Sequence, residues 1–172
     1  LRGLESFPLA STLRISCTDH EDPLVADKVL ADALASLPDG CWPAVTHIIP
    51  AQGSPFMPPR AAAHLARLCP RLQRVTVRTS YRDTHASAGD ELCGALEGLG
   101  AAHSTLEELF LDLSCRCLRP GSTQRAAAAL ASLRGLQQLR VHWTGDGPEE
   151  AASLLPAALP SLSALSSLDV VC

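Results

Sequence analysis

The chain has 172 residues, 47% of them hydrophobic, which suits one domain with a continuous core and excludes a disordered tail. Aromatic residues make up only 3%, so leucine, alanine and valine must build that core in thin, closely stacked layers. The formal net charge of −4 gives no general attraction to nucleic acid or anionic membranes, and no run approaches the roughly 18 apolar residues of a membrane span.

Six copies of one apolar pattern recur along the chain and predict six strands. The pattern is Φ-x-x-Φ-x-Φ, where Φ is an apolar residue, and its alternation is typical of a strand because every second side chain faces the same way. Pro50 replaces the last aliphatic residue of the second copy. The last positions of successive copies lie 27 to 35 residues apart, which indicates an internal repeat. In chain order the copies span residues 10–15, 45–50, 72–77, 106–111, 136–141 and 165–170.

An alanine- and leucine-rich stretch follows each of the first five copies and predicts a helix. These stretches span residues 22–37, 58–68, 89–99, 121–133 and 147–159. Prolines or capping residues mark four of the starts, as expected in the first turn of a helix. The markers are Asp22-Pro23, Pro58-Pro59, Ser122 and Gly147-Pro148.

Strand–helix units of near-constant period cannot bury their apolar faces alone. Stacked in register, they would form one parallel sheet with a row of helices on one side and a leucine core between the layers. Because helices are wider than the spacing of about 4.8 Å between strands, the stack is expected to bend with the sheet inside. We therefore expect an α/β solenoid of about six repeats, with the curved parallel sheet on the concave side and the α-helices on the convex side. It forms a single domain over residues 1–172.

These strand cores make the chain resemble the leucine-rich repeat family, and within it the long, helix-containing repeats of the ribonuclease-inhibitor type. The resemblance extends over essentially all 172 residues, with "LEELFLDLS" and "LQQLRVHWT" as the segments that match best. Three intervals exceed the family's usual length of roughly 20 to 29 residues, so extra loop or helix residues are expected after Ile15, Val77 and Leu111. The resemblance implies the fold and leaves the ligand open.

The family usually carries Asn or Cys three residues after the last core aliphatic residue, where the side chain bonds the backbone of the turn. Hydroxyl residues take this position in four of five units, and the resemblance implies that they form a weaker version of the same ladder. The five residues are Thr18, Gly53, Ser80, Ser114 and Thr144.

Residues between the Φ positions are expected on the concave face, where adjacent strands align them in rows. The four rows are Arg74, Glu108 and Gln138; Thr76, Phe110 and Arg140; Arg78, Asp112 and His142; and Thr79, Leu113 and Trp143. Phe110, Leu113 and Trp143, exposed together, would form an apolar patch rimmed by charge, which is the composition of a protein-binding hot spot. The alternative is that longer loops or a neighbouring segment cover these side chains. The predicted partner-binding residues are Arg74, Arg78, Glu108, Phe110, Asp112, Leu113, Arg140, His142 and Trp143.

Two other groups of residues invite a chemical interpretation. Cys115 and Cys117 lie two apart, but no second pair lies at ligand spacing and zinc needs four ligands, so we predict core or turn cysteines. The acidic run at 19–22 is expected in a solvated loop, with Asp22 as a helix cap. No metal and no cofactor are therefore predicted.

The six histidines offer no predicted catalytic site. Of these, only His47 and His142 align with the concave face, and no serine or cysteine lies in a nucleophile-elbow context. We therefore predict neither an enzyme nor a small-molecule substrate.

These patterns predict a non-catalytic interaction or scaffold module that binds a protein partner on its concave face, within a larger complex. Two alternatives stay open. One is the substrate-recognition region of a multi-domain adaptor or receptor, of the ubiquitin-ligase or immune-sensor type. The other is an RNA-contacting subunit of a ribonucleoprotein, which acidic residues among Arg74, Arg78 and Arg140 make less favoured.

The seven cysteines are scattered and odd in number, which favours an intracellular, reducing compartment, most simply the cytosol. Solenoids need capping repeats with polar outer faces, and neither end of the pattern supplies one. We therefore expect the chain to be a segment of a longer one, or to have its ends covered by partners.

Overall fold

The computed structural model describes residues 11–15, 23–50, 59–79, 88–102, 105–114, 118–144 and 149–171. Within these ranges, six strands alternate with five α-helices, and a 3-10 helix precedes the last strand. The strands are β1 (Thr12–Ile15), β2 (His47–Pro50), β3 (Arg74–Arg78), β4 (Glu108–Ser114), β5 (Gln138–Thr144) and β6 (Ser167–Val171). The helices are α1 (Pro23–Ala35), α2 (Pro59–Leu68), α3 (Ala88–Ala102), α4 (Pro120–Ala131), α5 (Glu149–Ala158) and the 3-10 helix η2 (Leu159–Ser161).

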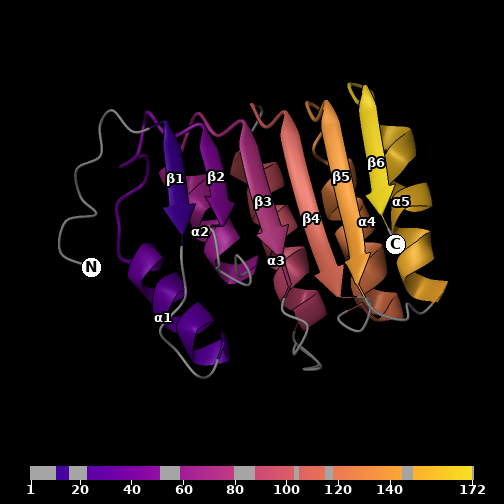
Figure 1. Ribbon diagram of the computed structural model, residues 1–172, viewed down its shortest axis with the longest axis horizontal. Coiled ribbons are helices and arrows are strands. Elements are labelled where there is room, and N and C mark those ends of the chain that lie inside the picture. Colours follow the sequence, from indigo (N-terminus) through magenta and orange to yellow (C-terminus); the bar gives the residue numbers. More distant parts are fainter. Residues whose placement is uncertain are drawn as a thin grey trace.

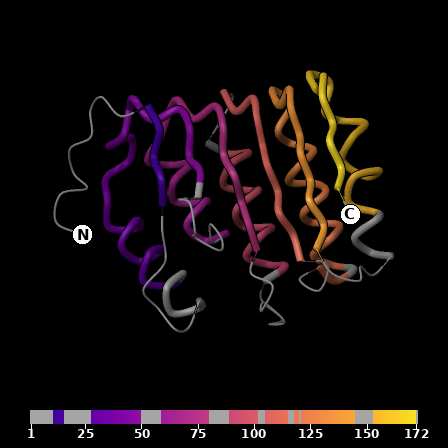
Figure 2. The backbone as a smooth tube through the Cα atoms, in the orientation of Figure 1, coloured from indigo at the N-terminus to yellow at the C-terminus, as the bar shows by residue number. Residues whose placement is uncertain are grey.

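The strands form one parallel sheet whose spatial order, β1 to β6, equals the chain order. Figure 1 shows the sheet in front and the helices in a row behind it. In Figure 2 the chain advances across the sheet from indigo to yellow, so that each unit lies beside its neighbours in sequence. The prediction of an α/β chain with a single parallel sheet is confirmed.

The predicted strand cores of β3, β4 and β5 pack between the sheet and the helices, where all nine Φ residues are buried. Gly98 of α3 faces Ala63 of α2, and a Cβ added to the glycine would lie 3.2 Å from the Ala63 Cβ. The missing side chain therefore lets the two helices come close together. The nine residues are Leu72, Val75, Val77, Leu106, Leu109, Leu111, Leu136, Leu139 and Val141.

At β6 the prediction of buried Φ residues is wrong. Leu168 and Val170 are each 43% exposed. They hold the same repeat positions as the buried Leu139 and Val141, with which they are in register. The difference arises because β6 is an edge strand of the described sheet, so no further unit packs against its outer side there.

Helix starts follow the predicted proline signals with one exception. α1 begins at Pro23 and α2 at Pro59, where the missing N–H of proline costs no hydrogen bond. α4 begins at Pro120 rather than at a Ser122 cap. Ser122 is the third residue of the helix, and its hydroxyl accepts a hydrogen bond of 2.9 Å from the N–H of Arg119, the residue before the helix. This hydrogen bond is one half of a capping box. Asp22, Pro58, Gly147 and Pro148 lie outside the described residues.

A repeated joint sets the register between neighbouring strands. Before each strand, one backbone carbonyl accepts hydrogen bonds of 2.8–3.0 Å from two successive N–H groups of the next unit. Gln73, for example, accepts from Glu107 and Glu108. The same geometry recurs at all five boundaries between the described strands, with Ser11, Thr46, Gln73, Glu107 and Gln137 as acceptors.

Candidate functional site

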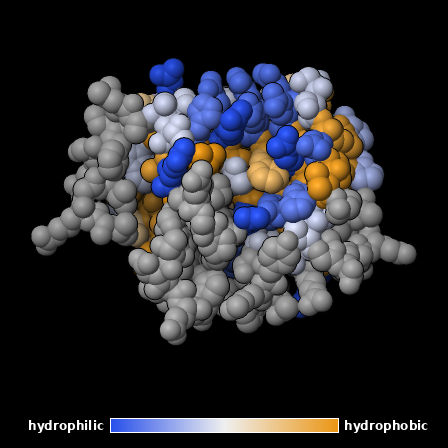
Figure 3. Space-filling view, viewed as in Figure 1, coloured by the Kyte–Doolittle hydropathy of each residue, from blue (hydrophilic) through white to orange (hydrophobic). Residues whose placement is uncertain are grey.

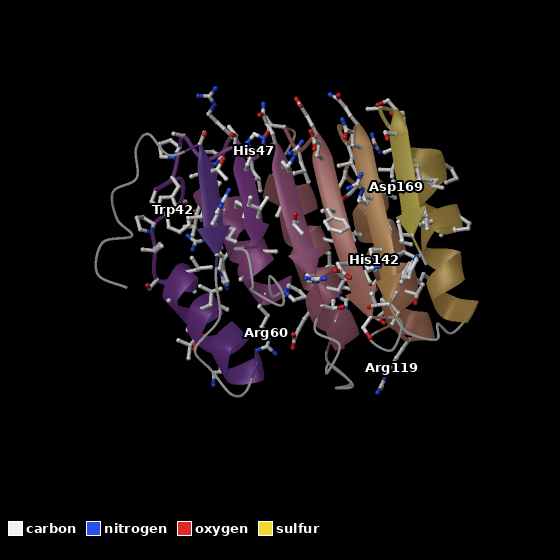
Figure 4. All side chains as sticks on the ribbon, in the orientation of Figure 1. Trp42, His47, Arg60, Arg119, His142 and Asp169 are labelled. Carbon is white, nitrogen blue, oxygen red and sulfur yellow. The ribbon has the colours of Figure 1, made fainter. Side chains whose placement is uncertain are left out.

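The open face is the side of the sheet that carries no helix, and every second strand residue belongs to it. The register places side chains of β3, β4 and β5 in rows that match the first three predicted rows. β6 extends these rows with Ser167, Asp169 and Val171. Figure 4 shows His142 and Asp169 as sticks on this sheet, and Figure 3 shows hydrophobic surface between hydrophilic groups near its middle.

The first row holds an ion pair between neighbouring strands. Arg74 of β3 pairs with Glu108 of β4, and the side chains of both remain partly exposed. Their hydrogen bond and the charge of the carboxylate raise the pKa of Arg74 above its usual range. The pair holds both side chains in place on the face.

The second row combines an aromatic ring with a guanidinium. The Arg140 Cζ lies 6.0 Å from the centroid of the Phe110 ring, which is within the range of a cation–π interaction. The Arg140 Nε also lies 2.7 Å from an Asp169 carboxylate oxygen on β6. Phe110 is only partly buried, so it presents apolar surface beside a fixed positive charge.

The third row is built around a buried carboxylate. Asp112 pairs with Arg78 on one side, and its other oxygen lies 3.3 Å from the His142 Nδ1. The predicted row is confirmed, but the expected place of Asp112 on an exposed rim is wrong. A carboxylate can be buried between two such partners because the Arg78 guanidinium offsets its charge and the His142 Nδ1 can donate to the other oxygen when that nitrogen carries a proton.

The predicted apolar patch of three side chains does not form. Leu113 is fully buried, because it shares the inward side of β4 with Leu109 and Leu111 at a spacing of two residues. Trp143, in register with Leu113, packs partly against the core. Phe110 is the member of the predicted patch that stands on the open face.

Hydroxyl groups form a ladder at the carboxyl ends of β3, β4 and β5. The Thr79 hydroxyl accepts a hydrogen bond of 2.8 Å from the Ser114 N–H, and the Thr144 hydroxyl donates one of 3.1 Å to the Leu113 carbonyl. All three hydroxyl residues are buried. Thr79 therefore belongs to the ladder and not to the open face, which corrects its predicted row. Thr18, Gly53 and Ser80 lie outside the described residues.

A hollow of about 340 Å³ opens on the face above Phe110. Two of its lining residues, Thr76 and Gln138, stood in the predicted rows but not in the predicted binding set. Asp169 was not predicted at all, although it follows Arg140 by one repeat spacing and continues that row. The polar and aromatic lining comprises Arg74, Thr76, Glu108, Phe110, Gln138, Arg140, Ser167 and Asp169.

The cysteines that the structure describes give the open face no reactive thiol. Cys69 and Cys93 are buried thiols, Cys41 is half-buried, and burial raises the pKa of Cys69 to about 12. Such a thiol holds almost no thiolate at neutral pH and is a poor nucleophile. Cys115 and Cys117 lie outside the described residues.

No protein-family model matches the sequence, and no curated protein matches it either. In the part of the chain that the structure describes, none of the helices combines the length and the apolar composition needed to cross a bilayer. The case for a function therefore rests on the geometry of the open face.

Proposed function

We propose that the chain is a leucine-rich repeat solenoid, and that it acts as a non-catalytic interaction or scaffold module which binds a protein partner on the open face. The sequential parallel sheet, the helices on one face and the repeated joint support the solenoid. Each of these features is expected when identical units stack only on their neighbours.

The observation that carries the binding role is Phe110 in its hollow. A partly exposed aromatic ring beside an arginine is the composition of an energetic anchor in protein interfaces. The ring lies near the middle of the sheet, on the fourth of six strands, and Arg140 is held above it by Asp169.

Pre-ordered side chains strengthen this proposal. Three ion pairs, one within each row, link neighbouring strands, so Arg74, Arg78 and Arg140 are already held on the face by a carboxylate. A partner that binds them loses less side-chain entropy than it would against free arginines, where immobilisation costs about 0.5–1.5 kcal/mol per side chain.

A photo-crosslinking experiment tests the binding face. We place p-benzoylphenylalanine at Ser167, beside the hollow, and in a second variant at Gln124, an exposed residue of α4 on the helical side. We expect protein adducts in cells from the Ser167 position and few from Gln124. Addition of Phe110→Ala should remove the Ser167 adducts. Equal adducts at both positions, or adducts that Phe110→Ala leaves unchanged, would refute the proposal.

A further inference from the structure

The charges on the open face are unevenly exposed, although they nearly balance in number. The described strands place four arginines and three carboxylates on this face, a difference of +1. The arginines are Arg14, Arg74, Arg78 and Arg140, and the carboxylates are Glu108, Asp112 and Asp169.

In each of the three ion pairs the guanidinium is more exposed than its carboxylate. The exposed side-chain fractions are 46% for Arg74 against 30% for Glu108, and 62% for Arg140 against 48% for Asp169. The contrast is greatest in the third row, where Arg78 is 35% exposed and Asp112 4%. A partner that approaches the face therefore meets more positive than negative charge, even though the whole chain is acidic.

The hollow also requires a ligand to place an apolar group between these arginines. Phe110 lies in the hollow, and Arg74 and Arg140 line it from the strands on either side, β3 and β5. A ligand that fits both features must carry an apolar side chain close to acidic groups. A protein segment can do so, because its carboxylates can be placed one by one while neutral residues face Glu108 and Asp169.

A nucleic acid fits this surface less well. Its phosphates follow one another at short, regular spacing, so some of them must face the partly exposed carboxylates of Glu108 and Asp169. The paired arginines also offer few uncompensated charges for the release of counterions.

We propose that the open face binds an acidic, extended segment of a protein partner, with carboxylates on Arg74 and Arg140 and one apolar side chain seated on Phe110. This inference rests on the proposed protein-binding function and names the chemistry of the partner.

Selection from a phage-displayed library of random dodecapeptides tests this partner chemistry. We expect the selected peptides to be enriched in Asp and Glu around one large apolar residue. A synthetic peptide of the selected sequence is then measured by fluorescence anisotropy. We expect the double variant Arg74→Gln/Arg140→Gln to weaken its binding by about tenfold or more.

The matched control removes the same charge elsewhere. Arg71→Gln/Arg134→Gln changes two exposed arginines in the turns before β3 and β5, and we expect it to leave peptide binding within about twofold of the wild type. Because all four arginines are exposed, both double variants should fold, which circular dichroism checks.

Three results would overturn the inference. The first is a selection that returns neutral or basic peptides, or none. The second is binding that both double variants weaken equally. The third is a random single-stranded RNA that binds the wild type more tightly than the peptide and is lost with Arg74→Gln/Arg140→Gln. Ser167 adducts to a protein, together with any of these results, would show that the binding face is right and the acidic partner wrong. Absence of Ser167 adducts when Phe110 is unchanged would refute the proposed function itself.

Discussion

The buried carboxylate of Asp112 gives the sharpest test of the open-face geometry. We compare Asp112→Ala with Asp169→Ala, which removes a carboxylate from the same face two strands away, on β6. Asp112 is 4% exposed and contacts both Arg78 and His142, whereas Asp169 is 48% exposed and contacts Arg140. Burial and the second partner are what distinguish the two sites.

The expected losses follow from these contacts. A hydrogen bond to a charged group contributes about 1.5–3 kcal/mol to net stability, and Asp112 has one ion pair, with Arg78, and a further contact of 3.3 Å with the His142 Nδ1. Arg78 and His142 are each 35% exposed, so water replaces part of the stabilising interaction that these two side chains lose when the carboxylate is removed. We therefore expect Asp112→Ala to lower the free energy of unfolding by about 2 kcal/mol, which corresponds to a fall in Tm of about 4–8 °C. Asp169→Ala should cost about 0.2–1 kcal/mol, as exposed ion pairs do.

Urea denaturation followed by circular dichroism measures both losses in the same buffer. The slope of the unfolding free energy against urea should stay constant, since neither change alters the surface that unfolding exposes. If the two variants differ by less than about 0.5 kcal/mol, the Asp112 carboxylate is not buried between two donors and the third row has been misread.

Three further outcomes are expected. Leu139→Ala should cost about 2–5 kcal/mol in urea denaturation and the register-matched Leu168→Ala less than half of that, because Leu168 is 43% exposed; equal losses would contradict the edge position of β6. Iodoacetamide at pH 8 should label the half-buried Cys41 before Cys69. The pKa of Cys69 is raised to about 12, so its thiolate forms only at higher pH, and rapid native labelling of Cys69 would contradict its burial. Phe110→Ala should leave the urea midpoint within about 1 kcal/mol of the wild type while it removes Ser167 adducts.

The architecture could be predicted because its signals are local and repeated. Alternating apolar residues at Val75 and Val77, and again at Leu109 and Leu111, indicate strands, and the near-constant spacing aligns them. The predicted rows placed Arg74 beside Glu108; their ion pair was not predicted, although their opposite charges on neighbouring strands were the signal for it.

Three residues were placed wrongly because the same alternation was not carried past the core pattern. Leu113 stands two residues beyond Leu111, so it points inward. Thr79 stands in the same relation to Val77, and Trp143 to Val141. Continuing the alternation of every second residue would have placed all three on the inward side.

The burial of Asp112 and the hollow above Phe110 could not be predicted from the pattern. Asp112 is buried by the combined positions of side chains from three strands, and the hollow depends on how Arg140 folds over the ring. A sequence period determines which residues share a row. It carries no information on the side-chain conformations that decide how much of each residue is covered.

The repeated joint has a consequence for how such a chain changes length. At every joint the two shared N–H groups belong to the backbone, so the joint can form with any following unit whose backbone takes the same conformation; at two joints the hydroxyls of Thr46 and Ser166 also donate to the acceptor carbonyl. If the unit that contains β4 were deleted whole, the Gln73 carbonyl would meet the N–H groups of Gln137 and Gln138 in place of those of Glu107 and Glu108. Units are therefore compatible in backbone geometry at their boundaries, and duplication or loss of one would alter the width of the open face while preserving the connections on either side.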